Sequence, residues 1–253
     1  MGLQAEMGKT FVIDCFPDSA RKYQRGYAVV AVDVIRATTM AITSVALGRR
    51  CFPVPSLEAA QAMAASLPHP VLAGEVAGDQ PEGFEMTNSP AELSLRRDSS
   101  RPLVLLSTSG TKLISMAYGA DSTYLACFRN YEAVARYLSG RHDRVAIIGA
   151  GSRGEFREED QMCCAWIGQS LMEAGYRPEC QGTAEVVERW RGIPPEACVD
   201  GNSAKYLART GYQKDLEFIL KHVNDLDSTF RMEGDEVMEL AVEPAKELYE
   251  ECA

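Results

Sequence analysis

The segment with the most reactive side chains runs from Asp33 to Thr39, directly after a strongly apolar run. Its sequence, Asp-Val-Ile-Arg-Ala-Thr-Thr, places one carboxylate, one guanidinium and two hydroxyls within seven residues. Arginine offers the forked donors that phosphate and sulfonate accept, and a carboxylate can hold a divalent metal beside such an anion. The competing interpretation is that Asp33 and Arg36 simply pair while Thr38 caps the next helix. We favour catalytic roles for Asp33 and Arg36 and substrate binding by Thr38 and Thr39.

A second polar loop, Ser-Thr-Ser-Gly-Thr at 107–111, carries four hydroxyls and a glycine after another apolar run. Such a loop can line an anion site with O–H and N–H donors. An ordinary Ser/Thr turn before a helix explains it equally well when it is taken alone. The substrate-binding candidates of this loop are Ser107, Ser109, Gly110 and Thr111.

The loop at 74–88 is longer than most connections between strands and helices, which suggests a functional role. Glu75 directly follows an expected strand and is its best candidate for a base or a metal ligand. Asn88 is a further substrate-binding candidate, whereas Glu82 and Glu85 are expected to be solvated.

Residues 149–154 have the G-x-G-x-x-G spacing, but the acidic run from Glu155 to Asp160 follows where a dinucleotide site needs an apolar helix. A divalent metal suits this acidic run better, although a charged first helical turn is an equally weighted alternative. Ser152 and Arg153 join the substrate-binding candidates. The metal-ligand candidates of the chain are four carboxylates: Asp33, Glu75, Glu159 and Asp160.

Histidine and cysteine chemistry is disfavoured. The three histidines, at 69, 142 and 222, lie outside every candidate loop, and the eight cysteines form no C-x-x-C pair. Cysteines inside apolar stretches are typical of core residues in a reducing compartment, which predicts a cytoplasmic protein. Metal-assisted chemistry with carboxylates, hydroxyls and arginine remains.

Strand-length apolar runs alternate with helix-length segments. The expected strands lie at 27–34, 51–54, 70–73, 103–106, 123–127 and 145–148, and the expected helices at 37–47, 57–67, 131–138 and 162–174. This alternation predicts an α/β fold of three α/β/α layers with a largely parallel or mixed sheet. Ligands of such sheets bind at the carboxyl ends of the strands, where the polar loops fall.

The chain also matches itself weakly at an offset of 74 residues, which lays the loop at 33–39 over the loop at 107–112. Two similar βαβα units would turn both loops, together with 149–155, toward one cleft; chance similarity is the alternative. Asn130, which this offset lays over the expected helix cap Ser56, is both an expected cap and a substrate-binding candidate.

Residues 1–175 are expected to form the α/β body, 176–231 a mainly helical continuation, and 232–253 an acidic C-terminal segment. The net charge is −10, of which the last 22 residues contribute −7. This acidity argues against nucleic acid or an anionic membrane as partner. No run is long and apolar enough to span a membrane, and the first ten residues lack a signal-peptide pattern.

Together the motifs resemble the 2-phosphosulfolactate phosphatase family over roughly residues 12–230. The matching segments are 32–39, 83–92, 107–111, 149–160 and 202–215. The resemblance implies an α/β/α enzyme that uses Mg²⁺ to convert phosphosulfolactate to sulfolactate and phosphate in coenzyme M biosynthesis. The positions that match the family directly are Asp33, Arg36, Thr38, Thr39, Asn88, Gly110, Thr111, Glu159 and Asp160.

Three departures from the family pattern bear on the substrate: Val76 replaces an arginine, Thr87 a glycine and Ser109 an asparagine. An enzyme of the same fold that acts on another phosphorylated hydroxy acid, or by another reaction, is therefore an alternative, as is a non-enzymatic protein that binds an anionic metabolite. In the favoured hypothesis, Asp33 with Glu75 or Asp160 holds Mg²⁺, and Arg153 grips the sulfonate or carboxylate end. Water and Asp33 both remain candidates for the nucleophile, and a homodimer is compatible with the resemblance.

Overall fold

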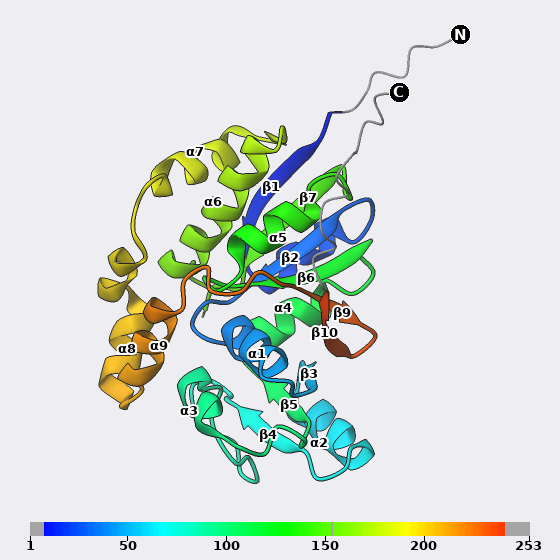
Figure 1. The fold of residues 1–253 in the computed structure, drawn as a ribbon, viewed down its shortest axis with the longest axis vertical. Helices are drawn as coiled ribbons and strands as arrows, with labels where there is room; N and C mark the ends of the chain where they lie inside the picture. Colours follow the sequence, from blue (N-terminus) through cyan, green and yellow to red (C-terminus); the bar gives the residue numbers. More distant parts are fainter. Residues whose placement is uncertain (1–7, 153, 241–253) are drawn as a thin grey trace, which may run out of the picture.

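The computed structural model describes residues 8–152 and 154–240, and its centre is a seven-stranded sheet (Figure 1). The strand order is β10-β9-β6-β2-β7-β1-β8. The strands are β1 (Thr10–Cys15), β2 (Ala28–Val32), β6 (Ser122–Ala126), β7 (Arg144–Gly149), β8 (Arg177–Pro178), β9 (Thr229–Glu233) and β10 (Glu236–Leu240). The five strands from β6 to β8 run parallel, whereas β9 and β10 are antiparallel additions.

The central strand β2 has the sequence Ala-Val-Val-Ala-Val, and all five residues are buried. Apolar residues at every position are typical of a parallel strand covered on both faces. Val29 of β2 pairs with Ala146 of β7 and Thr123 of β6. Because these strands are parallel, the loops after β2 and β7 leave the same edge of the sheet.

A second, three-stranded parallel sheet lies beside the first, in the order β3-β5-β4. Its strands are β3 (Cys51–Val54), β4 (Val71–Gly74) and β5 (Leu103–Leu106). Its outer face packs against α2 (Leu57–Ser66) through the cluster that contains Val54, Ala60 and Val104. Ser56 begins α2 by accepting a hydrogen bond from the backbone N–H of Ala59, as its sequence predicts.

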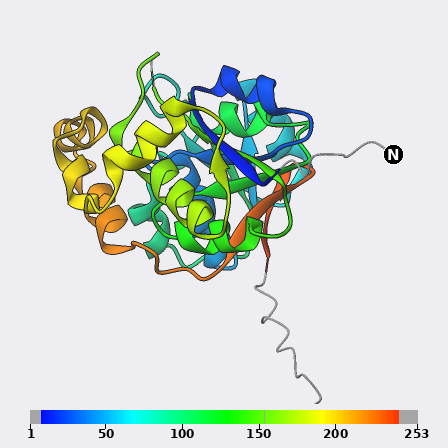
Figure 2. The same cartoon turned by 90° about the horizontal axis from the view of Figure 1, so that it is seen from above.

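Helices cover both faces of the main sheet, so the expected three-layer α/β/α class is confirmed (Figures 1 and 2). Side chains of α5 (Tyr131–Leu138), α6 (Glu158–Glu173) and α7 (Gln181–Trp190) form the core on one face. The other face packs against α1 (Ala37–Ala46), α4 (Gly110–Met116) and the 3₁₀ helix Pro17–Tyr23.

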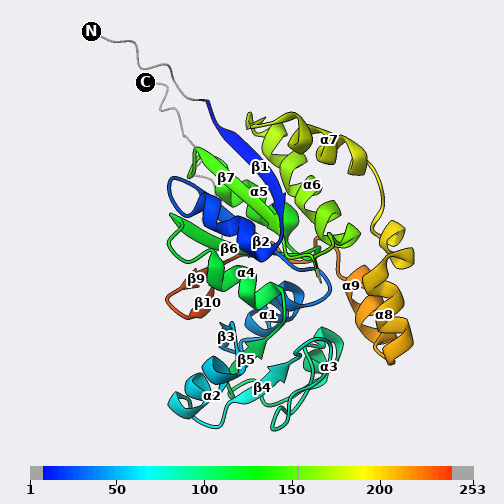
Figure 3. The same ribbon diagram turned by 180° about the vertical axis from the view of Figure 1, so that it is seen from behind.

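The chain after α7 forms a helical arm that reaches the small sheet. A 3₁₀ turn (Pro195–Asp200) leads into α8 (Asn202–Thr210) and α9 (Gln213–Lys221), and α9 packs against α3 (Pro90–Leu95). Figure 3 shows α8 and α9 beside α3, next to the small sheet. This arm closes one side of the edge at which the candidate loops lie.

Each of the two similar units suggested by the sequence contributes one strand to the main sheet and one strand to the small sheet. The first unit runs from β2 through α1 to β3, and the second runs from β5 through α4 to β6, so each crosses from one sheet to the other. Strand β2 pairs with β6, and β3 pairs with β5. This arrangement brings the loops after β2 and β5 to the same cleft, as the repeat predicts.

Four strands of the described residues were not predicted from the sequence: β1, β8, β9 and β10. Residues 229–240 form a hairpin on the edge of the main sheet, although the segment from 232 was expected only to be acidic. The rest of that segment, 241–253, lies outside the described residues, and the division into 1–175 and 176–231 stays a prediction. Within the described residues, no helix is long and apolar enough to cross a membrane.

Candidate active site

The candidate loops meet around one cavity of about 540 Å³ at the carboxyl ends of β2, β5 and β7. The loops that follow β2, β4, β5 and β7 contribute to its wall, together with Asp160 of α6 and residues of α8. The predicted site residues that line the cavity are Asp33, Arg36, Glu75, Asn88, Ser107, Ser109, Ser152 and Asp160.

Asp33 lies at the turn from β2 into α1. Its Oδ1 accepts a hydrogen bond from the N–H of Ala37 at 3.1 Å, which fixes the carboxylate beside the start of the helix. Gly110 packs against the other side: a Cβ there would overlap Asp33 Oδ2 and lie 2.5 Å from the Cβ of Ala37. Gly110 therefore acts by allowing the second loop to approach Asp33, because any side chain would separate the two loops.

Burial raises the pKa of Asp33 to about 7. This value includes the smaller raising effects of the negative charges of Glu75 and Glu159 and the lowering effects of the Ala37 N–H and of Arg36. A carboxyl with such a pKa exists in both ionisation states near neutral pH. This is the range in which a side chain can both accept and release protons during a reaction.

Asp160 lies in the first turn of α6 and is also buried. Its two carboxylate oxygens accept hydrogen bonds from the N–H groups of Val34 (2.8 Å) and Gly151 (3.1 Å). Burial and the charges of Asp33 and Glu159 raise its pKa well above the usual value. Asp160 thus ties the loop after β2 to the loop after β7.

Glu159 is the most unusual carboxylate of the group. It is 1% exposed, and neither of its oxygens has a hydrogen-bond partner among the described residues. Burial raises its pKa. It does not line the cavity; a Cβ on Gly201, just before α8, would lie 3.8 Å from its Oε2. Its influence on the cavity is therefore electrostatic, through Asp33 and Asp160.

Glu75 faces the cavity but is held by hydrogen bonds. Its Oε1 accepts from the N–H of Thr108 at 2.7 Å, and its Oε2 accepts from the Thr108 hydroxyl at 2.8 Å and from the N–H of Gly78 at 2.7 Å. Glu75 therefore joins the loop after β4 to the loop after β5. A carboxylate so engaged is less available as a base than Asp33.

Arg36 is buried and firmly positioned. Its Nη1 lies 2.5 Å from Oδ2 of Asp215 on α9, and its guanidinium stacks on the ring of Tyr212 with 4.7 Å between Cζ and the ring centre. Asp215 Oδ1 accepts from the Ser89 hydroxyl at 2.5 Å and the Ala91 N–H at 3.1 Å. The competing interpretation, in which Arg36 pairs with Asp33, is therefore wrong: α9 supplies the partner, and α3 is fixed to the same carboxylate.

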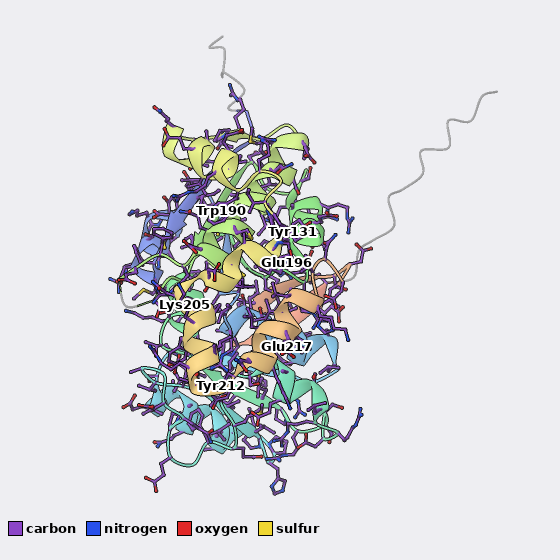
Figure 4. The ribbon with its side chains drawn as sticks, turned by 90° about the vertical axis from the view of Figure 1, so that its left-hand side faces the viewer. Tyr131, Trp190, Glu196, Lys205, Tyr212 and Glu217 are labelled. Carbon is purple, nitrogen blue, oxygen red and sulfur yellow. The ribbon has the colours of Figure 1, made fainter. Side chains whose placement is uncertain are left out.

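Three further basic residues line the cavity and were missed by sequence reasoning: Arg157, Lys205 and Arg209. Arg157 pairs with Glu155 at 3.1 Å, whereas Lys205 and Arg209 project from α8. Figure 4 shows Lys205 on α8 and Tyr212 at the turn that joins α8 to α9. The family resemblance did include residues 202–207, but no spacing rule shows that α8 folds over this edge.

The three predicted substrate-binding threonines point into the protein. Thr38 Oγ1 accepts from the N–H of Asp33 and donates to the carbonyls of Asp33 and Ala126, and Thr39 donates to Val34. Thr111 repeats the arrangement, accepting from the N–H of Ser107 and donating to its carbonyl. These threonines shape the loops instead of lining the cavity, and Thr38 matches Thr111 at a spacing of 73, one residue from the predicted offset.

The structure contradicts the substrate-binding role predicted for Asn130. It is completely buried away from the cavity, and its side chain accepts from the N–H of Cys127 at 3.0 Å and donates to the carbonyl of Leu125 at 3.2 Å. Both functions of the amide are thus used to hold the turn after β6, and the side chain makes no capping bond to α5. Asn88 keeps its place, since it lines the cavity with its Oδ1 unpartnered among the described residues. Arg153 lies outside the described residues.

The chain was compared with known proteins. Residues 15–228 match the model of a family described as 2-phosphosulpholactate phosphatase. A probable 2-phosphosulfolactate phosphatase of Pseudothermotoga lettingae is 32% identical over 76% of this chain and 84% of its own length. Proteins of the same description from Symbiobacterium thermophilum (32% identity; 76% of this chain, 86% of the relative) and Clostridium perfringens strain 13 (27%; 84% and 89%) are also similar.

Proposed function

Because the chain belongs to the 2-phosphosulpholactate phosphatase family, a family of phosphoric monoester hydrolases, we propose that it hydrolyses 2-phosphosulfolactate to sulfolactate and inorganic phosphate. The observation that carries this proposal is the cavity itself, which brings Asp33 and Arg36 together with hydroxyls of the second loop at one sheet edge. The product would place the reaction in coenzyme M biosynthesis, and a cytoplasmic location stays a prediction.

Arg36 is the residue best placed to neutralise the phosphoryl group. Its ion pair with Asp215 and its stacking on Tyr212 hold the guanidinium before substrate arrives. Such a fixed donor favours the transition state, because no reorganisation is needed as charge shifts on the phosphoryl oxygens. Ser107, Ser109 and Asn88 supply hydroxyl and amide groups that can orient the substrate in the same cavity.

Asp33 is the proposed proton acceptor or nucleophile. In the first route, a water oxygen attacks phosphorus, its proton passes to the Asp33 carboxylate, and the bond from phosphorus to the sulfolactate oxygen breaks, with a proton from solvent completing the hydroxyl of sulfolactate. In the second route, a carboxylate oxygen attacks phosphorus, the bond to the sulfolactate oxygen breaks and that oxygen takes a proton from solvent; water then attacks phosphorus and frees phosphate and the Asp33 carboxylate. Acid quenching with radiolabelled substrate separates them, since only the second route leaves a label on the protein.

Mg²⁺ is part of the proposal, and the carboxylates bear on its fit. Among the described residues, no three His, Cys, Asp or Glu side chains converge as a metal-binding group. A magnesium ion, however, commonly takes only one or two carboxylates and completes its shell with water and substrate phosphate. Asp33 fits this mode, because its Oδ2 receives no hydrogen bond from the described residues, with Glu75 or Asp160 as the second carboxylate. When bound, the ion would polarise a phosphoryl oxygen.

Phosphate release is the test of this function. Wild-type protein with Mg²⁺ is expected to release phosphate from 2-phosphosulfolactate, and Asp33→Asn should lower kcat by at least about 10²-fold. The exposed carboxylate Glu82 lies outside the cavity, so Glu82→Gln should keep wild-type activity while circular dichroism shows all three proteins folded. Absence of phosphate release from every phosphorylated hydroxy acid offered would reject a phosphatase. Unchanged turnover in excess chelator would reject the magnesium ion alone.

A related substrate is the second candidate. Ser109 lines the cavity where the family pattern has asparagine, so one amide of the expected set is replaced by a hydroxyl. Comparing kcat/KM for 2-phosphosulfolactate, phosphoglycolate and 2-phospholactate decides between the two substrate classes.

A further inference from the structure

Helix α8 turns one face toward the cavity. Asn202, Lys205, Tyr206 and Arg209 all line it, and their spacing of three and four residues places them on one side of the helix. Figure 4 shows Lys205 on this helix. The face is distinct from the loops that bear Asp33 and Ser107, because it comes from the arm and not from the strand ends.

The two basic residues of this face differ electrostatically from the other cations of the cavity. Arg36 is paired with Asp215 and Arg157 with Glu155. Lys205 and Arg209 are exposed, and neither forms an ion pair within the part of the chain that the structure describes. Among the described cations of the cavity, these two are therefore the ones whose charge is not offset by a contacting carboxylate of the described residues.

Their spacing adds a second argument. Lys205 and Arg209 are four residues apart, and like charges at this spacing disfavour a helix. The helix dipole does not compensate this repulsion for both residues, since only Arg209 lies in the last turn, where a positive charge is stabilised. An anion bound in the cavity close to both side chains would offset this repulsion.

Helix α8 is also held in place over the cavity. The hydroxyl of Tyr206 donates to the carbonyl of Gly78 at 2.9 Å, and the N–H of Gly78 donates to Glu75. Gly78 allows this contact, because a Cβ there would lie 2.6 Å from the Tyr206 hydroxyl and its φ is +101°. The basic face is thus linked through the 75–78 turn to the loop that carries Thr108.

We propose that Lys205 and Arg209 bind the anionic group at the end of the substrate away from the phosphoryl group, a sulfonate or a carboxylate. They are specificity-determining residues that favour phosphomonoesters with a second negative charge. The inference rests on the proposed function for its substrate, and a cavity of about 540 Å³ has room for more than a phosphoryl group.

The first test compares two substrates in four proteins. The proteins are wild type, Lys205→Gln, Arg209→Gln and the control Lys221→Gln, which removes a cation from α9 outside the cavity. For 2-phosphosulfolactate, each cavity variant should raise KM about tenfold or more with little change in kcat, since one charge-assisted hydrogen bond is lost. For p-nitrophenyl phosphate, which has no second anion, KM should change less than about twofold.

Equal effects on both substrates, or no effect on either, would overturn the inference while leaving the phosphatase intact. Binding of sulfolactate by calorimetry supplies a test that needs no turnover. Wild type and Lys221→Gln should bind sulfolactate alike, and both cavity variants should bind it about tenfold more weakly. Equal binding by all four proteins, or none by wild type, contradicts the role of α8 whatever the phosphate assay shows.

Discussion

Asp33 illustrates how a residue can carry function at a cost to stability. It is buried beside other carboxylates, and its pKa is raised to about 7. In an unfolded chain the pKa of aspartate is about 3.9. Between these values the unfolded state loses its proton first, so folding becomes less favourable as the pH rises.

We therefore predict that Asp33→Asn stabilises the folded protein at pH 8 relative to wild type. The difference in free energy of unfolding should grow from near zero at pH 4 to roughly 1 to 4 kcal/mol at pH 8, because only the wild type has the Asp33 carboxyl to ionise over this range. Asparagine keeps an Oδ1 that can accept from the Ala37 N–H, so the local fold is retained. Urea denaturation in the presence of chelator at both pH values measures the difference, and an equal difference at both would contradict it.

Residue types in the sequence showed where chemistry was possible, but not where side chains point. Ser107 and Thr111 belong to one predicted loop, yet the Thr111 hydroxyl bonds backbone groups of its own turn while Ser107 lines the cavity. Both residues have the hydroxyl that the prediction required. Their directions depend on the turn that precedes α4, and no spacing rule encodes it.

At the scale of elements, the cavity depends on two loops that come closer than ordinary side chains allow. Gly110 begins α4 against Asp33, where a Cβ would overlap the carboxylate. Arg36, from the loop after β2, is joined to α9 by a buried ion pair. Breaking such a pair by removing one partner leaves a buried charge uncompensated, so the arm and the strand ends form one unit.

Gly110→Ala is predicted to lower activity about 10²-fold or more, because it pushes α4 away from Asp33 and misplaces the second loop. It should also destabilise the fold by about 1 to 3 kcal/mol, as overpacking does. The control is Gly182→Ala in α7, where an added Cβ meets only Cys180 Sγ at 4.0 Å. Helix propensity favours alanine there, so the control should be as stable as wild type or more so. Thermal unfolding and phosphate release report both effects, and wild-type activity in Gly110→Ala would refute this account of the cleft.

The alternation of strands and helices between residues 27 and 174 could be predicted, because buried parallel strands are nearly continuous apolar runs. Strand β2 is the clearest case. The edge strands β9 and β10 could not be predicted in this way. β9 and β10 carry Glu233, Glu236 and Glu239, and their stability comes from pairing with each other and with β6. Helix α8 falls in the segment 176–231 that was expected to be mainly helical, but its position over the cavity depends on contacts such as that of Tyr206 with Gly78.

For the molecule as a whole, the net charge of −10 predicts repulsion of an anionic substrate, whereas four basic residues of the described chain line the cavity beside its carboxylates. Added salt screens both the repulsion by the net charge and the attraction by the cavity cations. Screening the repulsion raises kcat/KM, whereas screening the attraction lowers it. The local attraction by Lys205 and Arg209 should dominate, because less water and salt lie between the substrate and these nearby charges than between the substrate and the distant acidic surface.

We therefore predict that kcat/KM for 2-phosphosulfolactate falls as ionic strength rises from about 0.02 to 0.3 M, a range over which the screening length shrinks severalfold. In the variant with both Lys205→Gln and Arg209→Gln, the local attraction is lost and the net charge becomes −12, so kcat/KM should be flat or rise with salt. Potassium acetate in place of chloride tests whether the fall is competition by one particular anion. A wild-type kcat/KM that rises with salt would mean that the global charge governs the encounter, and that the basic face of α8 does not set the field that the substrate meets.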